Sequence, residues 1–572
     1  MSENEAVARR LDEIADILEA MDVEFKPRAY RRAADHVREL DRPIEQVAVD
    51  GVDALEEIEG VGEAIAEKIL EYLETGTIEE LEELREELPV DMAALTRVEG
   101  VGPKRVGALY EALGIRDLDE LEEAAEAGEI REVPGFGEKS EQNILEHIPF
   151  ARQAAKRHLL HIARSIGEGI LTDIEGLDAV EQCELAGSIR RWVPTIGDVD
   201  ILVATTAPEE LLDRIDGFSD IAETIEAGER KASYRTTEGV RVDFRFIGPE
   251  VFGAALQYFT GSKHHNVQVR QRAIDRGLKV NEYGVFTEDE ERIAGATEES
   301  MYAAVDLPWM APEIREGRGE IEAADAGELP TLVEPADMLG DLHVHSTWSD
   351  GSMSILEMAR AAETFGHEYI AITDHATGPG VVADIGLEDE ELLDQREEID
   401  AAMEATSITV IHGVEANIDT DGGISVTDDV LEALDLVIAS PHTSLSQDHD
   451  RATNRLITAI EHPHVDIIGH PTGRKLGQRP GLSVDIDRIA TKAAEHGVAL
   501  EVNSHPVRLD LEGEAVRTAI EHGATIAIST DAHVGHELEL LRYGVHTARR
   551  GWAEHADVLT TWSSDDVLEF LS

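Results

Sequence analysis

Two aspartates, two residues apart, open the part of the sequence that could carry out nucleotidyl transfer. Asp198 and Asp200 stand at the start of an apolar run, so on a β-strand both carboxylates face the same side. Asp243 lies in a second alternating run, placed to bring a third carboxylate against the first two. Three converging carboxylates repel one another unless hard cations neutralise them. We therefore expect two Mg²⁺ or Mn²⁺ ions, which would stabilise the attacking and leaving oxygens of an in-line displacement.

The residues just before Asp198 predict a triphosphate site. Gly187 and Ser188 open a turn or helix start, where backbone N–H groups and a hydroxyl can donate to phosphate, and Arg191 adds a cation. The alternative is that Asp198 and Asp200 are surface charges at a strand end. The Gly-Ser-Ile-Arg-Arg motif before them and the Arg-Val-Asp-Phe-Arg motif after them argue against it.

These motifs, and the Tyr-Phe-Thr-Gly-Ser-Lys-His-His-Asn-Val-Gln-Val-Arg segment at 258–270, resemble family X DNA polymerases, the relatives of DNA polymerase beta. In that family the aromatic pair abuts the incoming sugar, the asparagine contacts the base or triphosphate, and the last arginine reaches the nascent base pair. The resemblance implies nucleotide contacts from Gly187, Ser188, Arg191, Gly197, Tyr258, Phe259, Gly261, Asn266 and Arg270. Arg241 and Arg245 are implied DNA contacts. Trp192 and Lys263 depart from the pattern, which bears on base discrimination rather than on metal binding.

A short glycine-bearing motif recurs in the amino-terminal part, as Gly60-Val61-Gly62, Gly100-Val101-Gly102 and Gly135-Phe136-Gly137. Each follows a short helical segment and precedes another, and the latter are expected over 64–73, 104–113 and 139–147. We interpret these as helix-hairpin-helix motifs, whose glycines adopt positive φ and present N–H groups to DNA phosphate. Their carbonyls can also hold a monovalent cation that bridges to DNA. Plain helix–turn–helix packing is the alternative.

The first hairpin and the helix after it resemble the lyase domain of DNA polymerase beta. There a lysine forms a Schiff base with the deoxyribose left at an incised abasic site. The resemblance places Lys68 in that role, with Lys26 and Tyr30 in the pocket for the 5′-phosphate. Independently, 26–32 is the densest basic cluster in the chain. Ala64 departs from a second lysine common nearby, and Lys68 could instead be an ordinary DNA-contacting lysine.

In the carboxy-terminal part, seven short apolar runs each end in a candidate metal ligand. The candidates are His343, His345, Asp350, His375, Glu415, His442, His470, Asp531 and His533. Helices are expected between most runs, over 355–365, 390–403, 450–461, 486–496 and 511–522, so a seven-stranded parallel barrel with function at the strand carboxyl ends is predicted. Mixed nitrogen and carboxylate ligands favour Mn²⁺, Zn²⁺ or Fe²⁺, and nine suffice for three ions. The set resembles the PHP phosphoesterase domain, which implies hydrolysis of phosphodiesters by metal-activated water.

Other polar residues of this region lie off the ligand pattern. His264, His462, His464 and His496 are interpreted as surface residues. Asn503 and Arg508 are candidates for contacts with substrate phosphate. His505 stays undecided between the two groups.

The net charge of −70 over 572 residues is extreme, and its acids are spread among periodic apolar segments. This composition resembles haloarchaeal proteins. Near 1 M salt the Debye length is about 3 Å, so repulsion between acidic side chains and DNA is screened, and binding depends on short-range contacts. The single cysteine, Cys183, excludes an intramolecular disulfide and favours a cytoplasmic location. The sequence shows no signal peptide and no apolar run long enough to span a membrane.

We therefore predict an α-helical helix-hairpin-helix region, an α/β nucleotidyltransferase palm with a thumb, and a distorted (β/α)7 PHP barrel. The expected boundaries are 1–85 for a lyase-like domain with the first hairpin, 86–150 for a second helix-hairpin-helix subdomain, 151–248 for the palm, 249–315 for the thumb, 316–338 for a linker and 339–572 for the PHP domain.

The resemblance implies a polymerase that uses dNTPs to fill short gaps in gapped or nicked DNA during base-excision repair. It also implies a PHP 3′–5′ exonuclease or AP-endonuclease-type activity and a 5′-deoxyribose-phosphate lyase. A nuclease with a vestigial polymerase, a DNA-end-binding scaffold without catalysis, and a small-molecule phosphatase are the alternatives. We expect a monomer with no membrane partner.

Overall fold

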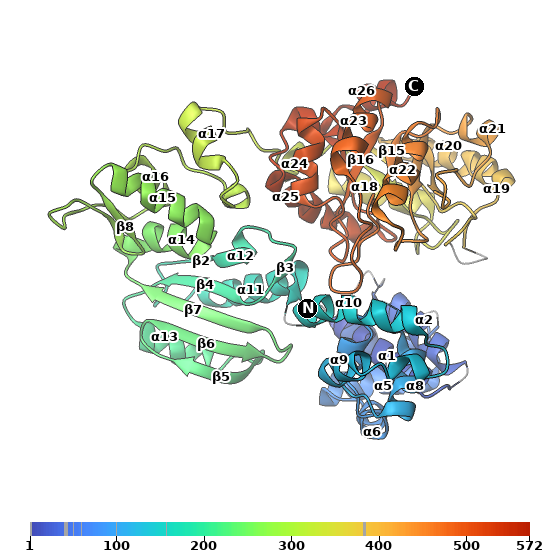
Figure 1. Cartoon of the computed structure of the whole chain (residues 1–572), viewed down its shortest axis with the longest axis horizontal. Helices are drawn as coiled ribbons and strands as arrows, with labels where there is room; N and C mark the ends of the chain where they lie inside the picture. Colours follow the sequence, from blue (N-terminus) through green and yellow to red (C-terminus); the bar gives the residue numbers. More distant parts are fainter. Residues whose placement is uncertain are drawn as a thin grey trace. The chain divides into compact units, whose positions relative to one another are not determined.

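The computed structural model describes residues 3–23, 25–38, 40, 44–49, 51–58, 60–98, 100–155, 157–380 and 385–572. The chain divides into two compact units, one of residues 1–157 with 475–480, the other of 158–474 with 481–572. Among the described residues the strands all begin after residue 157, so the first unit is helical and the second mixes helices with sheets (Figure 1).

The first unit is built from short helices. They are α1 (Glu3–Ala20), α2 (Lys26–Arg38), α3 (Ile44–Ala48), α4 (Val52–Leu55), α5 (Glu63–Thr75), α6 (Glu79–Glu87), α7 (Met92–Leu95), α8 (Pro103–Leu113), α9 (Leu118–Glu126), the 3-10 turn η1 (Ile130–Glu132) and α10 (Glu138–Ala155). Their apolar residues repeat at helical spacing: Val7, Leu11, Ile14 and Leu18 lie on one face of α1 and are buried. Each such side chain contributes about 1.5–3 kcal/mol to folding when fully buried.

The three predicted hairpins are present in this unit. The first glycine of each motif has positive φ, with 78° at Gly60, 82° at Gly100 and 89° at Gly135. The second glycine does not; instead Gly62 and Gly102 are the N-caps of α5 and α8. A Cβ added at the second glycine would meet no atom within 4 Å, so the backbone at these helix starts stays accessible.

The palm is a five-stranded sheet in the order β2-β4-β7-β6-β5. Its elements are β1 (His158–Leu159), α11 (Leu160–Glu175), β2 (Gln182–Leu185), α12 (Gly187–Arg190), β3 (Thr195–Ile196), β4 (Val199–Ala204), α13 (Pro208–Ile215), β5 (Ile221–Ala227), β6 (Lys231–Thr236) and β7 (Arg241–Ile247). Strand β4 pairs in parallel with β7 and is buried along almost all its length. It is therefore a buried interior strand of the sheet.

The thumb follows as η2 (Pro249–Val251), α14 (Phe252–Thr260), α15 (Lys263–Asp275), β8 (Lys279–Asn281), β9 (Gly284–Phe286), β10 (Arg292–Ala294) and α16 (Glu298–Ala303). A buried ion cluster joins it to the palm. Arg190 of α12 donates to both carboxylate oxygens of Glu298 at 2.8 Å, and the fully buried Arg315 donates to the same carboxylate at 2.6 and 3.2 Å. Burial alone would raise the pKa of Glu298. Because its carboxylate accepts hydrogen bonds from two guanidiniums, this pKa instead lies far below its usual range.

The segment expected to be a linker is packed rather than loose. After η3 (Pro312–Ile314), it forms α17 (Glu320–Ala326) and η4 (Pro335–Asp337). The buried Glu320 bonds the thumb residue His265 at 2.8 Å, and the Val333 N–H donates to the Ala553 carbonyl of the next domain at 2.9 Å. The chain between thumb and barrel is thus fixed at both ends.

The carboxy-terminal domain is the predicted parallel barrel. Its strands are β11 (Gly340–Val344), β12 (Tyr369–Ile372), β13 (Thr409–Asn417), β14 (Leu436–Ser440), β15 (Ile467–Ile468), β16 (Ala499–Asn503) and β17 (Ile526–Ser529), hydrogen-bonded in sequence order. A parallel bridge between Val344 and Ala532 brings the last strand back to the first, so the sheet is nearly closed. The fold is a distorted (β/α)7 barrel.

The barrel helices are α18 (Ile355–Phe365), α19 (Asp389–Asp394), α20 (Arg396–Ala405), α21 (Asp428–Leu431), α22 (His449–Ile460), α23 (Ile486–His496), α24 (Gly513–Glu521), η5 (Gly535–Leu540), α25 (Leu541–Arg550), η6 (His555–Asp557), η7 (Leu559–Thr561) and α26 (Ser564–Phe570). The expected helices at 355–365 and 486–496 match α18 and α23. The helix expected over 390–403 is present as α19 and α20, which are separated by the single residue Gln395. The Gln395 backbone stays helical, with φ of −58° and ψ of −26°, and its buried amide donates to Asp374 at 2.6 Å. None of the described helices is long and apolar enough to cross a membrane.

Candidate functional sites

The three palm aspartates are brought together by strand register. Asp200 in β4 is the direct partner of Asp243 in β7, and Asp198 immediately precedes β4. Burial, followed by the charges of Asp198 and Asp243, raises the pKa of Asp200 to about 7. Arg241 donates to both oxygens of Asp243 at 2.8 and 3.1 Å. The arrangement thus holds more negative charge than the protein neutralises, which suits divalent cations.

The approach of the α12 turn to this cluster requires glycine. Gly187 has φ of 62°, and a Cβ added there would lie 2.1 Å from Asp200 Oδ2. Any other side chain would displace the carboxylate. Ser188 follows at the start of α12, while the Arg191 side chain donates to the Thr260 carbonyl and, at 3.2 Å, to Glu316. Of the two adjacent arginines, Arg190 is therefore bound to the buried Glu298, and Arg191 lies beside the predicted nucleotide segment at Thr260.

The nucleotide segment predicted from the family motif spans the end of α14 and the start of α15. The Tyr258 and Phe259 rings are both half-buried and meet edge to face with centroids 5.2 Å apart. Asn266 donates to the Tyr258 carbonyl at 2.7 Å and accepts from Gln257 at 2.8 Å, so its amide is fixed. Arg270 is exposed on the same helix. Lys263 is also exposed, at the first position of α15.

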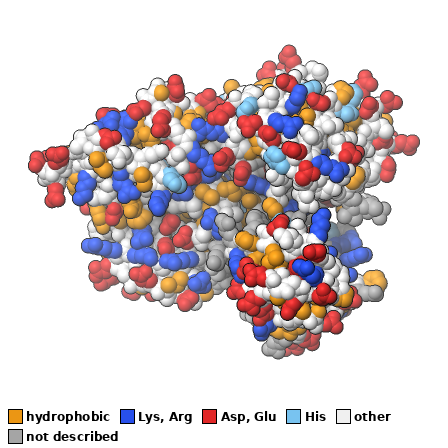
Figure 2. All heavy atoms as spheres, viewed as in Figure 1, with side chains coloured by type: hydrophobic (Ala, Val, Ile, Leu, Met, Phe, Trp, Pro, Cys, Tyr) orange, Lys and Arg blue, Asp and Glu red, His pale blue; other side chains and the backbone are white. Residues whose placement is uncertain are grey.

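A basic face covers the palm sheet of this acidic protein. In the β6–β7 register Lys231 pairs with Arg245 and Arg235 with Arg241, so these four side chains share the face of Asp243. Figure 2 shows Lys and Arg side chains gathered along β7, whereas Asp and Glu are spread over the amino-terminal helices. Such a face is what a DNA-binding surface needs.

All nine predicted PHP ligands converge at the carboxyl ends of the barrel strands. Three groups have ligand atoms within 4.8 Å of one another: His345 with Asp350, His375 and His533; His343 with His345 and Glu415; and His375 with Glu415 and His442. The remaining two contact the same cluster, since His470 Nε2 lies 3.0 Å from Glu415 and Asp531 lies 3.1 Å from His345 Nε2. His345, His375 and Glu415 each belong to two groups, so the three groups form one continuous cluster.

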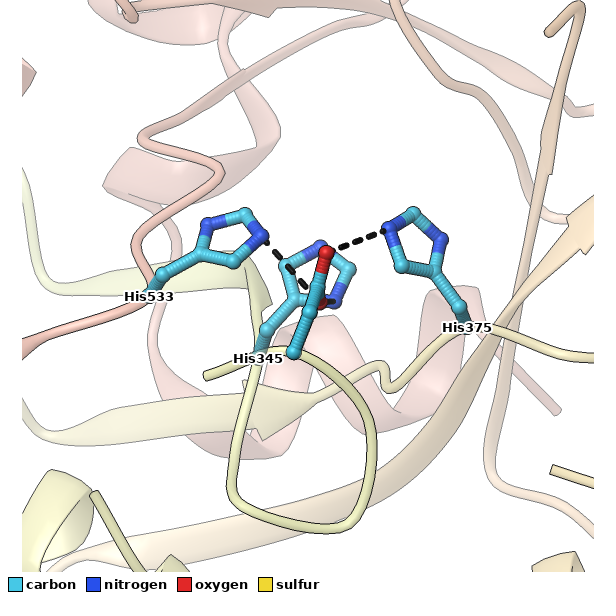
Figure 3. A group of neighbouring side chains, drawn as sticks. His345, His375 and His533 are labelled. Carbon is cyan, nitrogen blue, oxygen red and sulfur yellow. Dashed lines mark ion pairs between the residues drawn. The ribbon is translucent and has the colours of Figure 1, made fainter. Parts of the chain in front are cut away.

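The chemistry of these donors fits metal ions. His343 Nε2 is buried without a hydrogen-bond partner, a costly state unless a cation completes it. Figure 3 shows the imidazoles of His345, His375 and His533 close together. The Asp350 carboxylate lies 3.5 Å from His375 Nε2 and 3.2 Å from His533 Nε2. Although burial opposes it, the hydrogen bond with Asp350 raises the pKa of His533 to about 9.

A second set of buried acids, missed by the sequence interpretation, orients the ligands. Glu501 of β16 accepts from His343 Nδ1 at 2.7 Å and from the His470 N–H at 2.6 Å. Asp341 accepts from the His343 N–H at 3.1 Å. Both acids lie on strands two residues before a residue of the site, and this same-face spacing was the available signal.

The two candidates for phosphate contacts, Asn503 and Arg508, and the undecided His505 lie near Asp531. The Asn503 amide donates to Asp531 Oδ2 at 3.0 Å, and Arg508 Nε lies 3.5 Å from the same oxygen. Burial lowers the pKa of His505 to about 4, so it is a neutral imidazole. His264 and His496 are exposed as predicted, while His462 and His464 are half-buried.

In the amino-terminal unit, one glutamate gathers the three residues assigned to a lyase pocket. Glu80 of α6 lies 2.9 Å from Lys68 Nζ, accepts from the Tyr30 hydroxyl at 2.9 Å and lies 3.8 Å from Lys26 Nζ. The sequence did not single out Glu80 because it lies in an acidic helix, Glu79–Glu87. A carboxylate therefore stands where these residues are predicted to hold a phosphate.

At the second hairpin, an arginine side chain donates to carbonyls of the kind that were predicted to bind a monovalent cation. Arg105 donates to the Gly100 carbonyl at 2.6 Å and to the Gly135 carbonyl at 3.3 Å. It ties the second hairpin to the third.

Comparison with known proteins agrees with this architecture. Family profiles match the DNA polymerase beta thumb at 255–316, a helix-hairpin-helix domain at 2–78, a SAM-like helix-hairpin-helix tandem at 92–148 and the PHP domain at 341–505. The DNA polymerase/3′-5′ exonuclease PolX of Bacillus subtilis is 38% identical over 575 residues, which cover 99% of this chain and 98% of that protein. The chain belongs to the family X DNA polymerases with a carboxy-terminal PHP domain.

Other relatives of this family X chain share only part of it. A probable phosphatase of Caldanaerobacter subterraneus is 34% identical over 209 residues, 34% of this chain and 76% of the relative. A probable phosphatase of Shewanella is 38% identical over 140 residues, 23% of this chain and 53% of the relative.

The pKa of Asp200 generates a test of the palm cluster. Because its folded pKa of about 7 exceeds the ordinary 3.8, the protonated carboxyl favours folding at low pH, and this contribution is lost as pH rises from about 4 to 7. In EDTA, Asp200→Asn should stabilise the protein by up to about 4 kcal/mol at pH 8 and by less than about 2 kcal/mol at pH 5. Denaturant unfolding in molar KCl measures it. The exposed Asp213→Asn should change neither value, and an Asp200→Asn protein no more stable at pH 8 would contradict the cluster.

Glu501 generates a test of the barrel site. Replacing it by glutamine removes the charge that orients His343 while keeping its size, so affinity for Mn²⁺ or Zn²⁺ should fall about 10–100-fold. Competition with a chelating dye measures the affinity without relying on catalysis. The matched control is Glu495→Gln, an exposed glutamate of α23 paired with Lys492 at 2.8 Å. Equal affinities of the Glu501→Gln protein and wild type would rule out this role.

Proposed function

We propose that this chain is a DNA-directed DNA polymerase with a PHP 3′–5′ exonuclease, acting on short gaps in DNA during base-excision repair. The observation that carries the proposal is the full-length match to a DNA polymerase/3′-5′ exonuclease, in a chain where both sets of ligand residues converge. The substrates would be gapped or nicked DNA and dNTPs. A monomeric state and a cytoplasmic location remain predictions from the sequence.

In the polymerase reaction, Asp198, Asp200 and Asp243 would hold two divalent ions, Mg²⁺ or Mn²⁺, which when bound neutralise the triphosphate and lower the pKa of the primer hydroxyl. Ser188 and Arg191 would bind the phosphates, while Tyr258 and Phe259 border the sugar. Asp243, which accepts from Arg241, would help to take the proton of the primer 3′-OH. Gly187 allows phosphate and carboxylate to approach closely.

In the nuclease reaction, the nine barrel residues would hold up to three ions, Mn²⁺, Zn²⁺ or Fe²⁺, which when bound supply hydroxide and polarise phosphate. Glu501 keeps His343 in the tautomer that presents Nε2 to the site. Arg508 and Asn503 lie at the rim of Asp531, where they can bind the scissile phosphate. The same chemistry would serve an AP-endonuclease-type cut.

A labelled primer on a one-nucleotide gap tests both activities together. In high KCl with Mn²⁺, wild type should extend the primer when dNTPs are present and shorten it when they are absent. Extension should be lost only in Asp198→Ala/Asp200→Ala, and shortening only in His343→Ala/His345→Ala, because the ligand sets are separate. His496→Ala, an exposed histidine outside the cluster, is the control.

The same assay separates the alternatives. Shortening without extension in wild type would mean a nuclease with a silent polymerase. If wild type neither extends nor shortens the primer, a DNA-end-binding scaffold without catalysis is the remaining alternative. Phosphate release from small esters without primer shortening would favour a phosphatase, as the names of the shorter relatives suggest.

The amino-terminal pocket supports a further proposed activity, a 5′-deoxyribose-phosphate lyase. Lys68 Nζ would attack the C1′ aldehyde and expel water to form a Schiff base, which requires the neutral amine. Glu80 lies 2.9 Å from that amine. Lys26 and Tyr30, gathered by the same carboxylate, would then bind the 5′-phosphate.

Borohydride trapping on an incised abasic site tests the lyase. Wild type should form a covalent adduct, and Lys68→Ala should lose it, since no other amine replaces Nζ at that position. Lys104→Ala, a lysine of the helix after the second hairpin, should trap like wild type. An undiminished yield from Lys68→Ala would show that this lysine is only a DNA contact.

A further inference from the structure

One helix of the PHP domain packs on the loop that carries the nucleotide-binding arginine of the palm. Helix α25 begins eight residues after the ligand His533 and contributes its last turns to the contact. Two points of attachment fix it to the palm. One is a ring stack on Trp192, and the other is a pair of hydrogen bonds from Arg550.

Trp192 is held on both faces of its ring. The His546 imidazole of α25 stacks on one face with a centroid distance of 3.6 Å and an interplanar angle of 7°, and the Arg164 guanidinium of α11 lies 3.7 Å from the ring centroid. Trp192 has φ of 55°, an unfavourable backbone conformation for a bulky residue. The residue that departs from the family pattern is therefore an anchor for the PHP domain, not a base contact.

Arg550 acts on the neighbouring residue, Arg191. It donates to the Arg191 carbonyl at 2.6 Å and to Glu316 Oε1 at 2.9 Å. The same Glu316 oxygen accepts from the Arg191 side chain at 3.2 Å. Arg550 thus fixes the Arg191 backbone. It also shares Glu316 with the Arg191 side chain, so less of the negative charge of Glu316 opposes phosphate binding.

Helix α25 is in turn fixed to the barrel and to the segment before it. A Cβ at Gly544 would lie 2.0 Å from Ser504 Oγ, so the helix backbone lies directly on the carboxyl end of β16. His546 Nδ1 and Arg549 Nε both bond Glu313, at 2.7 and 2.8 Å. Any displacement of α25 would therefore change its contacts with Arg191 and Trp192.

We infer that Arg550 of the PHP domain is a positioning residue for nucleotide binding in the palm. It acts by holding Arg191 in place, and the Trp192–His546 stack keeps Arg550 aligned with Arg191. The inference rests on the proposed polymerase function and adds a dependence of dNTP binding on a residue of the nuclease domain. Arg550 itself contacts neither substrate nor metal ligands.

Steady-state gap filling with varied dNTP tests this. Arg550→Gln should raise the KM for dNTP about tenfold, the effect of losing one charge-assisted hydrogen bond, and should change kcat less than about twofold. Arg550→Lys should recover part of the affinity, because an ammonium still donates to the carbonyl. The control is Arg488→Gln, an exposed PHP arginine that donates to Asn454 at 2.8 Å. Primer shortening and thermal unfolding, measured on every variant, should stay at wild-type values.

Three results would overturn the inference. Wild-type KM in Arg550→Gln would refute it while leaving the polymerase proposal intact, whereas no extension by wild type would refute both. A fall in kcat with unchanged KM would show a merely structural role. Should Arg550→Gln fail to fold, His546→Ala removes the stack instead and must raise the same KM, while Trp192→Phe, which keeps an aromatic face, must not.

Discussion

Carboxylates that face one another inside the protein are the constraint on which both sites depend. In the palm, Asp200 and Asp243 are paired in strand register with only Arg241 bonded to the pair, so the pKa of Asp200 rises to about 7. In the barrel, Glu415 lies within 4 Å of five imidazoles, those of His343, His345, His375, His442 and His470. The palm thus lacks positive charge that cations must supply. The barrel is arranged by its own ion pairs, and metal binding there must release protons.

The acidic surface sets a second constraint, since an acidic protein has to hold DNA. Cations are gathered along β6 and β7, where DNA contact is proposed. Arginine suits this use because its planar fork makes bidentate bonds that remain effective when salt screens longer-range attraction. Arginine also forms ion pairs inside the protein, where Arg190 and Arg315 both bind Glu298. Buried pairs of this kind are screened far less than exposed ones.

The sequence predicts which of these side chains come together, because strand period and strand ends place them on a known face or edge. Asp200 and Asp243 share one face of the palm sheet, and most of the nine barrel residues lie at or just after strand ends. Prediction from the sequence fails where a contact joins distant segments that carry no recognisable motif. Glu80 lies in a run of glutamates, and nothing in that run indicates which of them meets Lys68. Trp192 could be interpreted only against the family pattern, and its partner His546 lies more than 350 residues away.

The contact between palm and PHP domain is polar and aromatic, and its composition explains what it can do. A flat apolar interface would tolerate sliding, but the ring stack on Trp192 and the carbonyl contact of Arg550 are satisfied in a single register. The strained φ of Trp192, like that of the ligand Asp531 at 58°, persists only because its surroundings determine it. Chain order makes this economical, since α25 follows the last ligands of the barrel directly. A domain that supplies one active site can therefore also hold the geometry of the other.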